Sequence, residues 1–386
     1  MLEMKGIVIV SFLLIMLTIT LITNKKMILS IKKNSFFIES IDLSYLLFIV
    51  LFWLLAISIQ DSYDIDAYRW AYNKQLLHGK EPLFDILQLY FNYIDWSFDE
   101  FKAFWVTIVA ILLYTGVKEY CESPHKVISL ALITVLTGFI TQMRSAIVCA
   151  IFLNAFRLII LGRFKDKMIY VIIIIFAAQI HMVGYCFLLF LFIEKKKAVQ
   201  FKYAYYITVL LATLVALFIS DFASSYIYFF MSFFLKDAEG SARALDYFQG
   251  NATHFRFGIF LVCKHLAMFL LTNKACEFLI KKSVDIMERK YRYEAIKKAN
   301  SLMLVFLPIT ILSASFERLF NCFSLIQYAM VFEACRNEKF LSKKISLRQS
   351  LLLIMICSEL TFFLVQLSFS PDDLLRILNS IELVIR

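Results

Sequence analysis

Long apolar runs, separated by short polar segments, fill most of the sequence. Residues 6–22, 41–59 and 350–369 are runs of about 17–21 mostly apolar residues, which is enough for a helix to cross a hydrocarbon core of about 30 Å. A bilayer core offers no water to unpaired backbone groups, so such runs are expected to be helical. The pattern predicts an all-α, polytopic integral membrane protein with about 10–12 transmembrane or half-spanning helices.

Basic residues concentrate between the apolar runs, which is the pattern that orients membrane proteins, and we place these segments in the cytoplasm. Two other polar stretches are then extracytoplasmic: the acid-rich residues 60–100, expected to be helical, and residues 221–256. Residues 370–386 have leucine and isoleucine at helical spacing, which predicts an amphipathic helix on the outer surface. With no repeat and no soluble domain, residues 1–386 are predicted to form a single polytopic membrane domain.

The spacing of the basic segments also predicts three outer turns. Dividing each apolar interval in half places these turns at residues 142–144, at His181 and at residues 315–318. Each turn then presents a polar side chain at the outer end of a helical hairpin. The interval 168–193 has an alternative interpretation as one long tilted helix, which would reverse the orientation of everything after it. The positions of the later basic loops argue against that alternative.

Composition and charge narrow the possible functions. The chain is 61% hydrophobic, with a mean hydropathy of +0.75 and a formal net charge of +10. Because the basic residues lie between the apolar runs, we attribute this charge to membrane orientation and expect no nucleic-acid partner. The sequence has no Gly-rich phosphate loop, zinc-binding helix or paired Cys-x-x-Cys motif. We therefore expect no metal and no cofactor.

Arg144 is the sharpest candidate for a site residue, because a cation within a long apolar interval is rarely without a role. Its planar guanidinium stays charged and makes paired hydrogen bonds to phosphate oxygens, so we predict that it binds a diphosphate. The alternative is an interfacial arginine that reaches the headgroups. Arg318 is a second diphosphate-binding candidate, unless it only forms a local ion pair with Glu317. Arg256 and Arg243, in the second outer segment, are two more.

Two further ionisable residues stand out. His181, in AAQIHMVG, is either a general base or phosphate donor, or a packed histidine that bonds to a neighbouring helix. Lys264 lies within an apolar run, where a cation is costly. It either serves a site or pairs with Glu359, which lies in the last apolar run.

The segment DSYDIDAYRWAYN, residues 61–73, combines carboxylates with aromatic rings. Carboxylates can act as a general base toward a sugar hydroxyl, and aromatic faces suit sugar rings. The candidates are Asp64 and Asp66 for the base, and Tyr63, Tyr68 and Arg69 for contacts with an acceptor sugar. The alternative is a surface helix that is N-capped by Asp61 or Asp64 and has an apolar stripe.

Blocks of the sequence resemble a known family. In the first, DSYDIDAYRWAYN precedes EPLF, where Glu81 and Pro82 open a helix. In the second, MRSAIVCAIFLNAF places Arg144 before a helix of small apolar residues. In the third, FAAQIHMVGYCFLLF places His181 at a short-helix junction, and FERLFNCF adds a later arginine segment. These blocks are similar to the EpsG-like branch of the Wzy-type bacterial polysaccharide polymerases, although Ser145 stands where a polar Gln is expected.

The resemblance implies an O-antigen or exopolysaccharide polymerase. Such a glycosyltransferase moves a growing glycan from undecaprenyl diphosphate to a second lipid-linked repeat unit, at the outer face of the bacterial cytoplasmic (inner) membrane. The implied partners are the undecaprenyl-diphosphate-linked oligosaccharide and membrane lipid, with a chain-length regulator and a flippase. The alternatives are a lipid-linked glycan flippase or transporter, another membrane glycosyltransferase, or an acyltransferase of the same pathway. The scarcity of Gly (9) and Pro (4) argues against a transporter built from broken helices.

Overall fold

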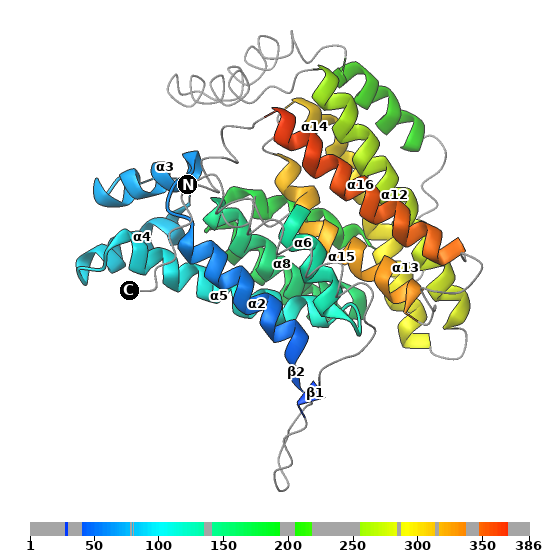
Figure 1. The fold of residues 1–386 in the computed structure, drawn as a ribbon, viewed down its shortest axis with the longest axis horizontal. Coiled ribbons are helices and arrows are strands. Elements are labelled where there is room, and N and C mark those ends of the chain that lie inside the picture. The colour runs from blue at the N-terminus through cyan, green and yellow to red at the C-terminus, as the bar shows by residue number, and fades with distance from the viewer. Residues whose placement is uncertain are drawn as a thin grey trace, which may run out of the picture. The chain divides into compact units, whose positions relative to one another are not determined.

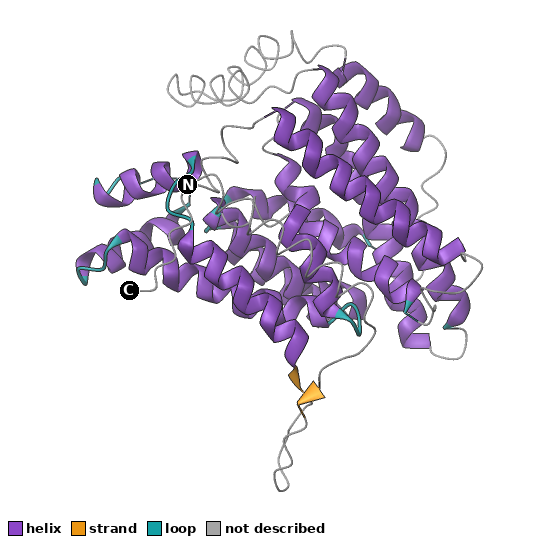
Figure 2. Cartoon of the chain, viewed as in Figure 1, coloured by secondary structure: helices purple, strands orange, loops and turns teal. Residues whose placement is uncertain are grey.

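In the computed structural model, the described residues are 28–29, 41–77, 79, 81–134, 141–193, 205–217, 255–283, 287–312, 316–336 and 347–369. Most of them are helical (Figures 1 and 2). The first elements are β1 (Ile28–Leu29), β2 (Ile41–Asp42), α2 (Leu43–Ser58), α3 (Tyr63–Asn73), α4 (Pro82–Tyr93), α5 (Phe98–Lys118), α6 (Pro124–Thr134), α8 (Met143–Leu161), α9 (Phe164–Ala178) and the 3-10 helix η1 (Met182–Phe192). Then come helix Tyr205–Leu217, α12 (Phe255–Lys282), α13 (Met287–Met303), η2 (Leu304–Phe306), α14 (Leu307–Leu312), α15 (Glu317–Cys335) and α16 (Leu347–Phe369).

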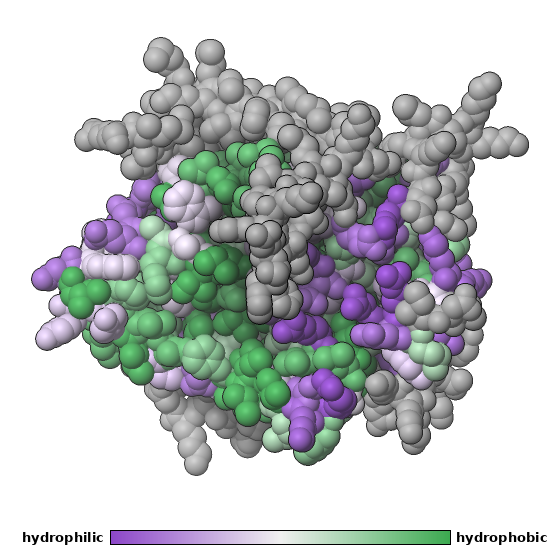
Figure 3. Space-filling model, turned by 90° about the horizontal axis from the view of Figure 1, so that it is seen from below, coloured by the Kyte–Doolittle hydropathy of each residue, from purple (hydrophilic) through white to green (hydrophobic). Residues whose placement is uncertain are grey.

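The helices have the length and surface of a membrane protein. Within the described ranges, α5, α8 and residues Gly258–Lys282 of α12 are long and apolar enough to cross a bilayer, and four shorter apolar helices accompany them. Large apolar side chains are exposed on these helices, and the space-filling view shows broad apolar areas (Figure 3). This confirms the predicted helical structure, with helices that are candidates for membrane spans. The number of passes stays a prediction, because residues 6–22, nearly all of 221–256 and 370–386 lie outside the described ranges.

The three predicted turns coincide with helix boundaries. Gln142 is non-helical and α8 begins at Met143. Helix α9 ends at Ala178, and after His181 the chain continues as η1, so the interval 168–193 is broken rather than one long helix. Glu317 is the first residue of α15. These boundaries agree with the positions expected for hairpin tips.

Two compact units make up the chain. The first comprises the described residues up to Leu188 and those from Ser324 onwards, and the second comprises those from Leu189 to Phe323. In the first unit, β1 and β2 pair antiparallel, with Ile28 opposite Asp42.

Helices α5 and α8 run in the same direction in the first unit. Trp105 Nε1 donates to the carbonyl of Met143 at 2.8 Å, and further along both helices the Thr115 hydroxyl donates to Asn154 Oδ1 at 2.8 Å. The helices approach closely at Gly116, where an added Cβ would stand 2.9 Å from Leu153 Cβ. After Gly162, which has a φ of 68°, α9 reverses direction. The start of α8 and the end of α9 therefore lie at the same end of the bundle.

Helices α3 and α4 precede α5 and pack on its first turns through aromatic rings. Tyr72 stacks on Phe101 with ring centroids 5.1 Å apart, and Phe84 meets Trp105 edge to face at 5.3 Å. Ser62 caps α3 by accepting from the Ile65 N–H at 3.1 Å. The alternative interpretation of this segment had Asp61 or Asp64 as the cap; that assignment is wrong, because Ser62 stands one residue before the first helical residue.

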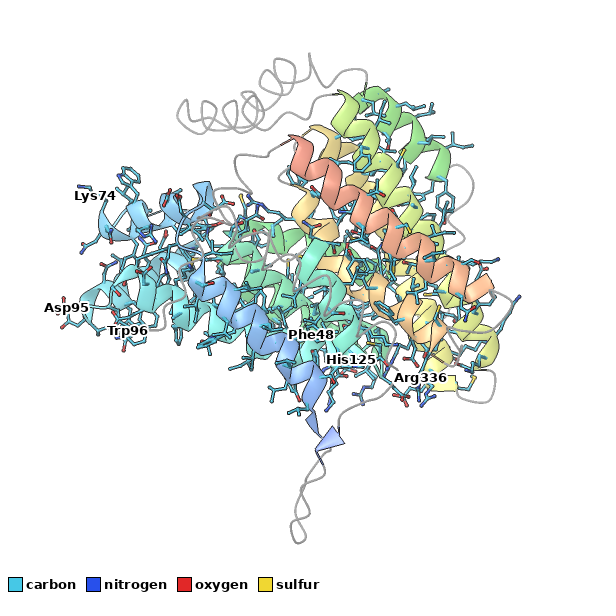
Figure 4. All side chains as sticks on the ribbon, in the orientation of Figure 1. Phe48, Lys74, Asp95, Trp96, His125 and Arg336 are labelled. Atoms are coloured by element: carbon cyan, nitrogen blue, oxygen red, sulfur yellow. The ribbon has the colours of Figure 1, made fainter. Side chains whose placement is uncertain are left out.

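The far end of α5 has its own polar contacts, away from α3 and α4. In Figure 4, Lys74 and Asp95, at the ends of α3 and α4, lie on the left of the view, and His125 and Arg336 lie on the right. Arg336 pairs with Glu122, which follows α5, so the start of α6 and the end of α15 lie at one side. The sequence predicts that the basic residues near these two positions face the same compartment, and which side they face stays a prediction.

Polar pairs join the helices of the second unit. Lys264 Nζ lies 3.2 Å from Glu317 Oε1, so this buried cation pairs with the first residue of α15. Asn300 Nδ2 donates to the Phe269 carbonyl at 3.0 Å and ties α13 to α12.

Candidate functional site

The carboxylate of Glu81 joins residues from three separate segments of the first unit. Its Oε1 accepts from Nδ1 of His181 and, at 3.4 Å, from the backbone N–H of Met182. Its Oε2 accepts from Nη1 of Arg144. The side chains of Glu81, Arg144 and His181 are 5%, 17% and 13% exposed, so the cluster is mostly buried but its two basic members still reach the surface. We call these three residues the Glu81 cluster.

The electrostatics of the cluster decide which ring nitrogen of His181 carries a proton. Burial raises the pKa of the Glu81 carboxyl, but the hydrogen bond from His181 and the charges of Arg144 and His181 outweigh burial and hold that pKa below its ordinary value. Glu81 is therefore ionised at neutral pH and only accepts hydrogen bonds. The bond to Nδ1 then requires a proton on Nδ1, which leaves the lone pair of the neutral ring on Nε2.

Aromatic rings hold the guanidinium of Arg144. Its Cζ lies 5.0 Å from the ring centroid of Tyr68 and 5.4 Å from that of Phe84, within the range of cation–π attraction. Its Nε lies 3.4 Å from Oη of Tyr68 and donates to it. Nη1 donates to Glu81. In the described part of the chain Nη2 makes no hydrogen bond.

Backbone contacts place the segments that carry these side chains. The N–H of Leu83 donates to the carbonyl of Gln179 at 3.1 Å, which ties the start of α4 to the end of α9. Trp105 anchors the first peptide of α8, next to Arg144. The buried Lys102 donates to the carbonyls of Ile57 and Ile59, near the end of α2, and fixes the loop that leads into α3.

The structure brings together some of the residues predicted from the sequence. Arg144 and His181, far apart in the chain, contact the same carboxylate, and Tyr68 contacts Arg144. Asp66 instead pairs with Arg69 at 3.3 Å, and Arg69 also donates to the carbonyl of Gln60 at 2.9 Å. These contacts make Arg69 a brace of the α2–α3 loop.

Other predicted residues lie elsewhere. Asp64 is partly exposed one helical turn before Tyr68. Arg318 belongs to the second unit, where its Nε is buried without a hydrogen-bond partner. Arg243 lies outside the described residues, as do the side chains of Arg256 and Tyr63, so their predicted roles stay predictions.

Glu81 is the member of the cluster that the sequence alone did not single out. In the sequence it is distinguished only as the residue before Pro82, where α4 begins. Nothing local separates it from the other acids of residues 60–100, and its partners lie 63 and 100 positions away. Within the described ranges, no group of three His, Cys, Asp or Glu side chains is arranged to hold a metal ion.

The EpsG family model matches residues 43–379, which is most of the chain and includes the whole Glu81 cluster. The chain belongs to the EpsG family. This membership suggests a polysaccharide polymerase-type role. Together, the family and the apolar helices point to a membrane protein. No curated protein and no solved structure matches the chain significantly.

Proposed function

We propose that this EpsG-family protein is a polysaccharide polymerase of the O-antigen or exopolysaccharide type. It transfers a glycan from undecaprenyl diphosphate to a lipid-linked repeat unit, at the outer face of the bacterial cytoplasmic membrane. The supporting observation is that one ionised carboxylate, Glu81, contacts both a histidine and an arginine at the helix ends of a membrane bundle. A base and an anion-binding cation are the two groups that such a transfer needs.

The histidine supplies the base. With its Nδ1 proton held by Glu81, His181 presents its lone pair on Nε2 and accepts the proton of the acceptor hydroxyl. The hydroxyl oxygen then bonds to the anomeric carbon of the donor glycan. Glu81 keeps the ring in one tautomer and stabilises the imidazolium that forms, which is the role of an orienting carboxylate. We therefore favour His181, supported by Glu81, over Asp64 and Asp66 as the base.

The arginine stabilises the leaving group. As the bond from the anomeric carbon to the diphosphate oxygen breaks, its electron pair stays on that oxygen and negative charge develops there. Arg144, held by Tyr68 and Phe84, is fixed before the reaction, and such preorganised charge is effective in a site of low dielectric. Arg318, Arg256 and Arg243 remain candidates for further diphosphate contacts. Tyr63 and Arg69 remain candidates for the acceptor side, and a flippase and a chain-length regulator are the expected partners.

Replacing Arg144 tests this function in cells. In Arg144→Ala, and less severely in Arg144→Lys, the cell-surface glycan should lose long chains and keep single repeat units. Arg157→Ala is a matched control, because Arg157 lies on the same helix in an exposed pair with Glu119. A flippase variant would lose both single repeats and long chains, and an acyltransferase variant would keep normal chain length. Long chains at the normal level in Arg144→Ala would contradict the proposal.

A further inference from the structure

The first turn of α8 has donors without acceptors. Gln142, at the N-cap position, makes no side-chain cap, and the first intrahelical bond runs from the Ala146 N–H to its carbonyl at 2.9 Å. Among the described residues, nothing accepts from the N–H groups of Met143, Arg144 and Ser145. Met143 and Ser145 are buried, and buried helix ends normally find partners.

Ser145 gives an independent indication of a ligand. Its residue is 3% exposed, and its Oγ is buried with no hydrogen-bond partner, not even a carbonyl of the preceding turn. Ser145 is the third residue of α8, and the Cα–Cβ bond of a helical residue tilts toward the N-terminus of its helix. An acceptor that lies just beyond the N-terminus of the helix would satisfy a hydroxyl of this kind.

We propose that the first turn of α8 is a phosphate cradle, formed by the backbone N–H groups of Met143, Arg144 and Ser145, the Ser145 hydroxyl and Nη2 of Arg144. Its ligand is the diphosphate of the lipid-linked glycan, so the inference rests on the proposed function and adds Ser145 to it. Helix N-termini favour anions because their N–H groups and their dipole point at the ligand.

The surrounding charges are compatible with an anion. At this end of α8 the acidic side chain of Glu81 pairs with two basic side chains, those of Arg144 and His181. When His181 takes the acceptor proton, the cluster gains a positive charge as the diphosphate leaves. The Trp105 bond to the Met143 carbonyl keeps the cradle aligned with α5.

Binding to the purified full-length protein in phosphatidylcholine nanodiscs tests the cradle. The probes are undecaprenyl diphosphate and inorganic diphosphate, with phosphatidylglycerol as a competitor that offers an ordinary headgroup phosphate. Ser145→Ala should weaken undecaprenyl diphosphate binding by about 10-fold, the usual effect of one lost hydrogen bond to a charged group. Ser145→Asp should weaken it by more than about 100-fold, while its unfolding temperature stays equal or rises, because a carboxylate there caps the helix itself.

Ser129→Ala is the matched control, since Ser129 is another buried serine but bonds to the Lys126 carbonyl. The proposal is overturned if Ser145→Asp binds undecaprenyl diphosphate as the wild type does, or if phosphatidylglycerol competes as well as the diphosphate. Normal binding in Ser145→Ala would also overturn it. Failure of the polymerase function is separate: it would appear as long chains in Arg144→Ala while the Ser145 variants still lose diphosphate binding.

Discussion

Replacing Glu81 by Gln tests the central contact of the site by exchanging one carboxylate oxygen for an amide NH₂. The Gln side chain keeps one oxygen, which can accept from Nη1 of Arg144. Its amide NH₂ then faces Nδ1 of His181, and two donors cannot bond to each other. His181 must therefore shift its proton to Nε2, the atom that we propose takes the proton of the acceptor hydroxyl. The variant keeps the shape of the cluster and removes the base.

The size of the effect follows from these contacts. A misplaced tautomer removes general-base catalysis, which contributes about 10²–10⁴-fold in rate, equivalent to about 3–5 kcal/mol. The stability cost is smaller, about 1.5–3 kcal/mol, because one charge-assisted hydrogen bond to Glu81 is lost in a mostly buried setting. Glu119→Gln is the matched control: Glu119 pairs with Arg157 at 3.2 Å, but both side chains are more than a third exposed, so we expect less than about 1 kcal/mol.

The assay is turnover of lipid-linked repeat units by the purified protein, read as chain length on a gel. Glu81→Gln, His181→Gln and the double variant form a cycle. When two residues act together, removing either one abolishes their shared contribution to the rate. The double variant should therefore be about as slow as the slower single variant. Normal turnover in Glu81→Gln, or a loss in the double variant equal to the product of the two single losses, would refute the reasoning.

Four further predictions concern the surroundings of the cluster. The pKa of the Glu81 carboxyl lies below its ordinary value, so ionised Glu81 stabilises the folded protein at pH values above the ordinary pKa, and this stabilisation is lost as the pH falls through the lowered pKa. The difference in unfolding temperature between wild type and Glu81→Gln should therefore shrink in acid, and a difference that widens would contradict this. Tyr68→Phe keeps the ring beside Arg144 and should lose less than about 3-fold in turnover, whereas Tyr68→Ala should lose about 10–100-fold; equal losses would exclude the ring contact. Trp105→Phe should lower the free energy of unfolding by about 1 kcal/mol and raise the KM for the lipid-linked donor, and an unchanged KM would separate it from the site. In a cysteine-free background, an impermeant maleimide should label Gln142→Cys in intact cells and Glu122→Cys only after permeabilisation; labelling of both from one side would contradict the topology.

The positions where helices begin and end could be predicted from the sequence, because they depend on whether neighbouring residues suit lipid or water. Apolar length and the placement of basic residues predicted breaks at residues 142–144 and at His181, and both appear in the structure. The sequence also predicts Arg144 and His181 at helix ends, where the structure places them, since a charged or polar side chain amid apolar neighbours is conspicuous.

The partner that unites Arg144 and His181 was decided by tertiary structure. Glu81 is one acid among many in its segment, and its contacts depend on how α4, α8 and α9 end at the same place. Asp66 is as conspicuous in the sequence, yet packing pairs it with Arg69. Local sequence determines which segments are helical and where they turn, because these depend on neighbouring residues and on the solvent. Which carboxylate meets which cation depends on contacts up to a hundred residues apart, and only the packed helices specify those.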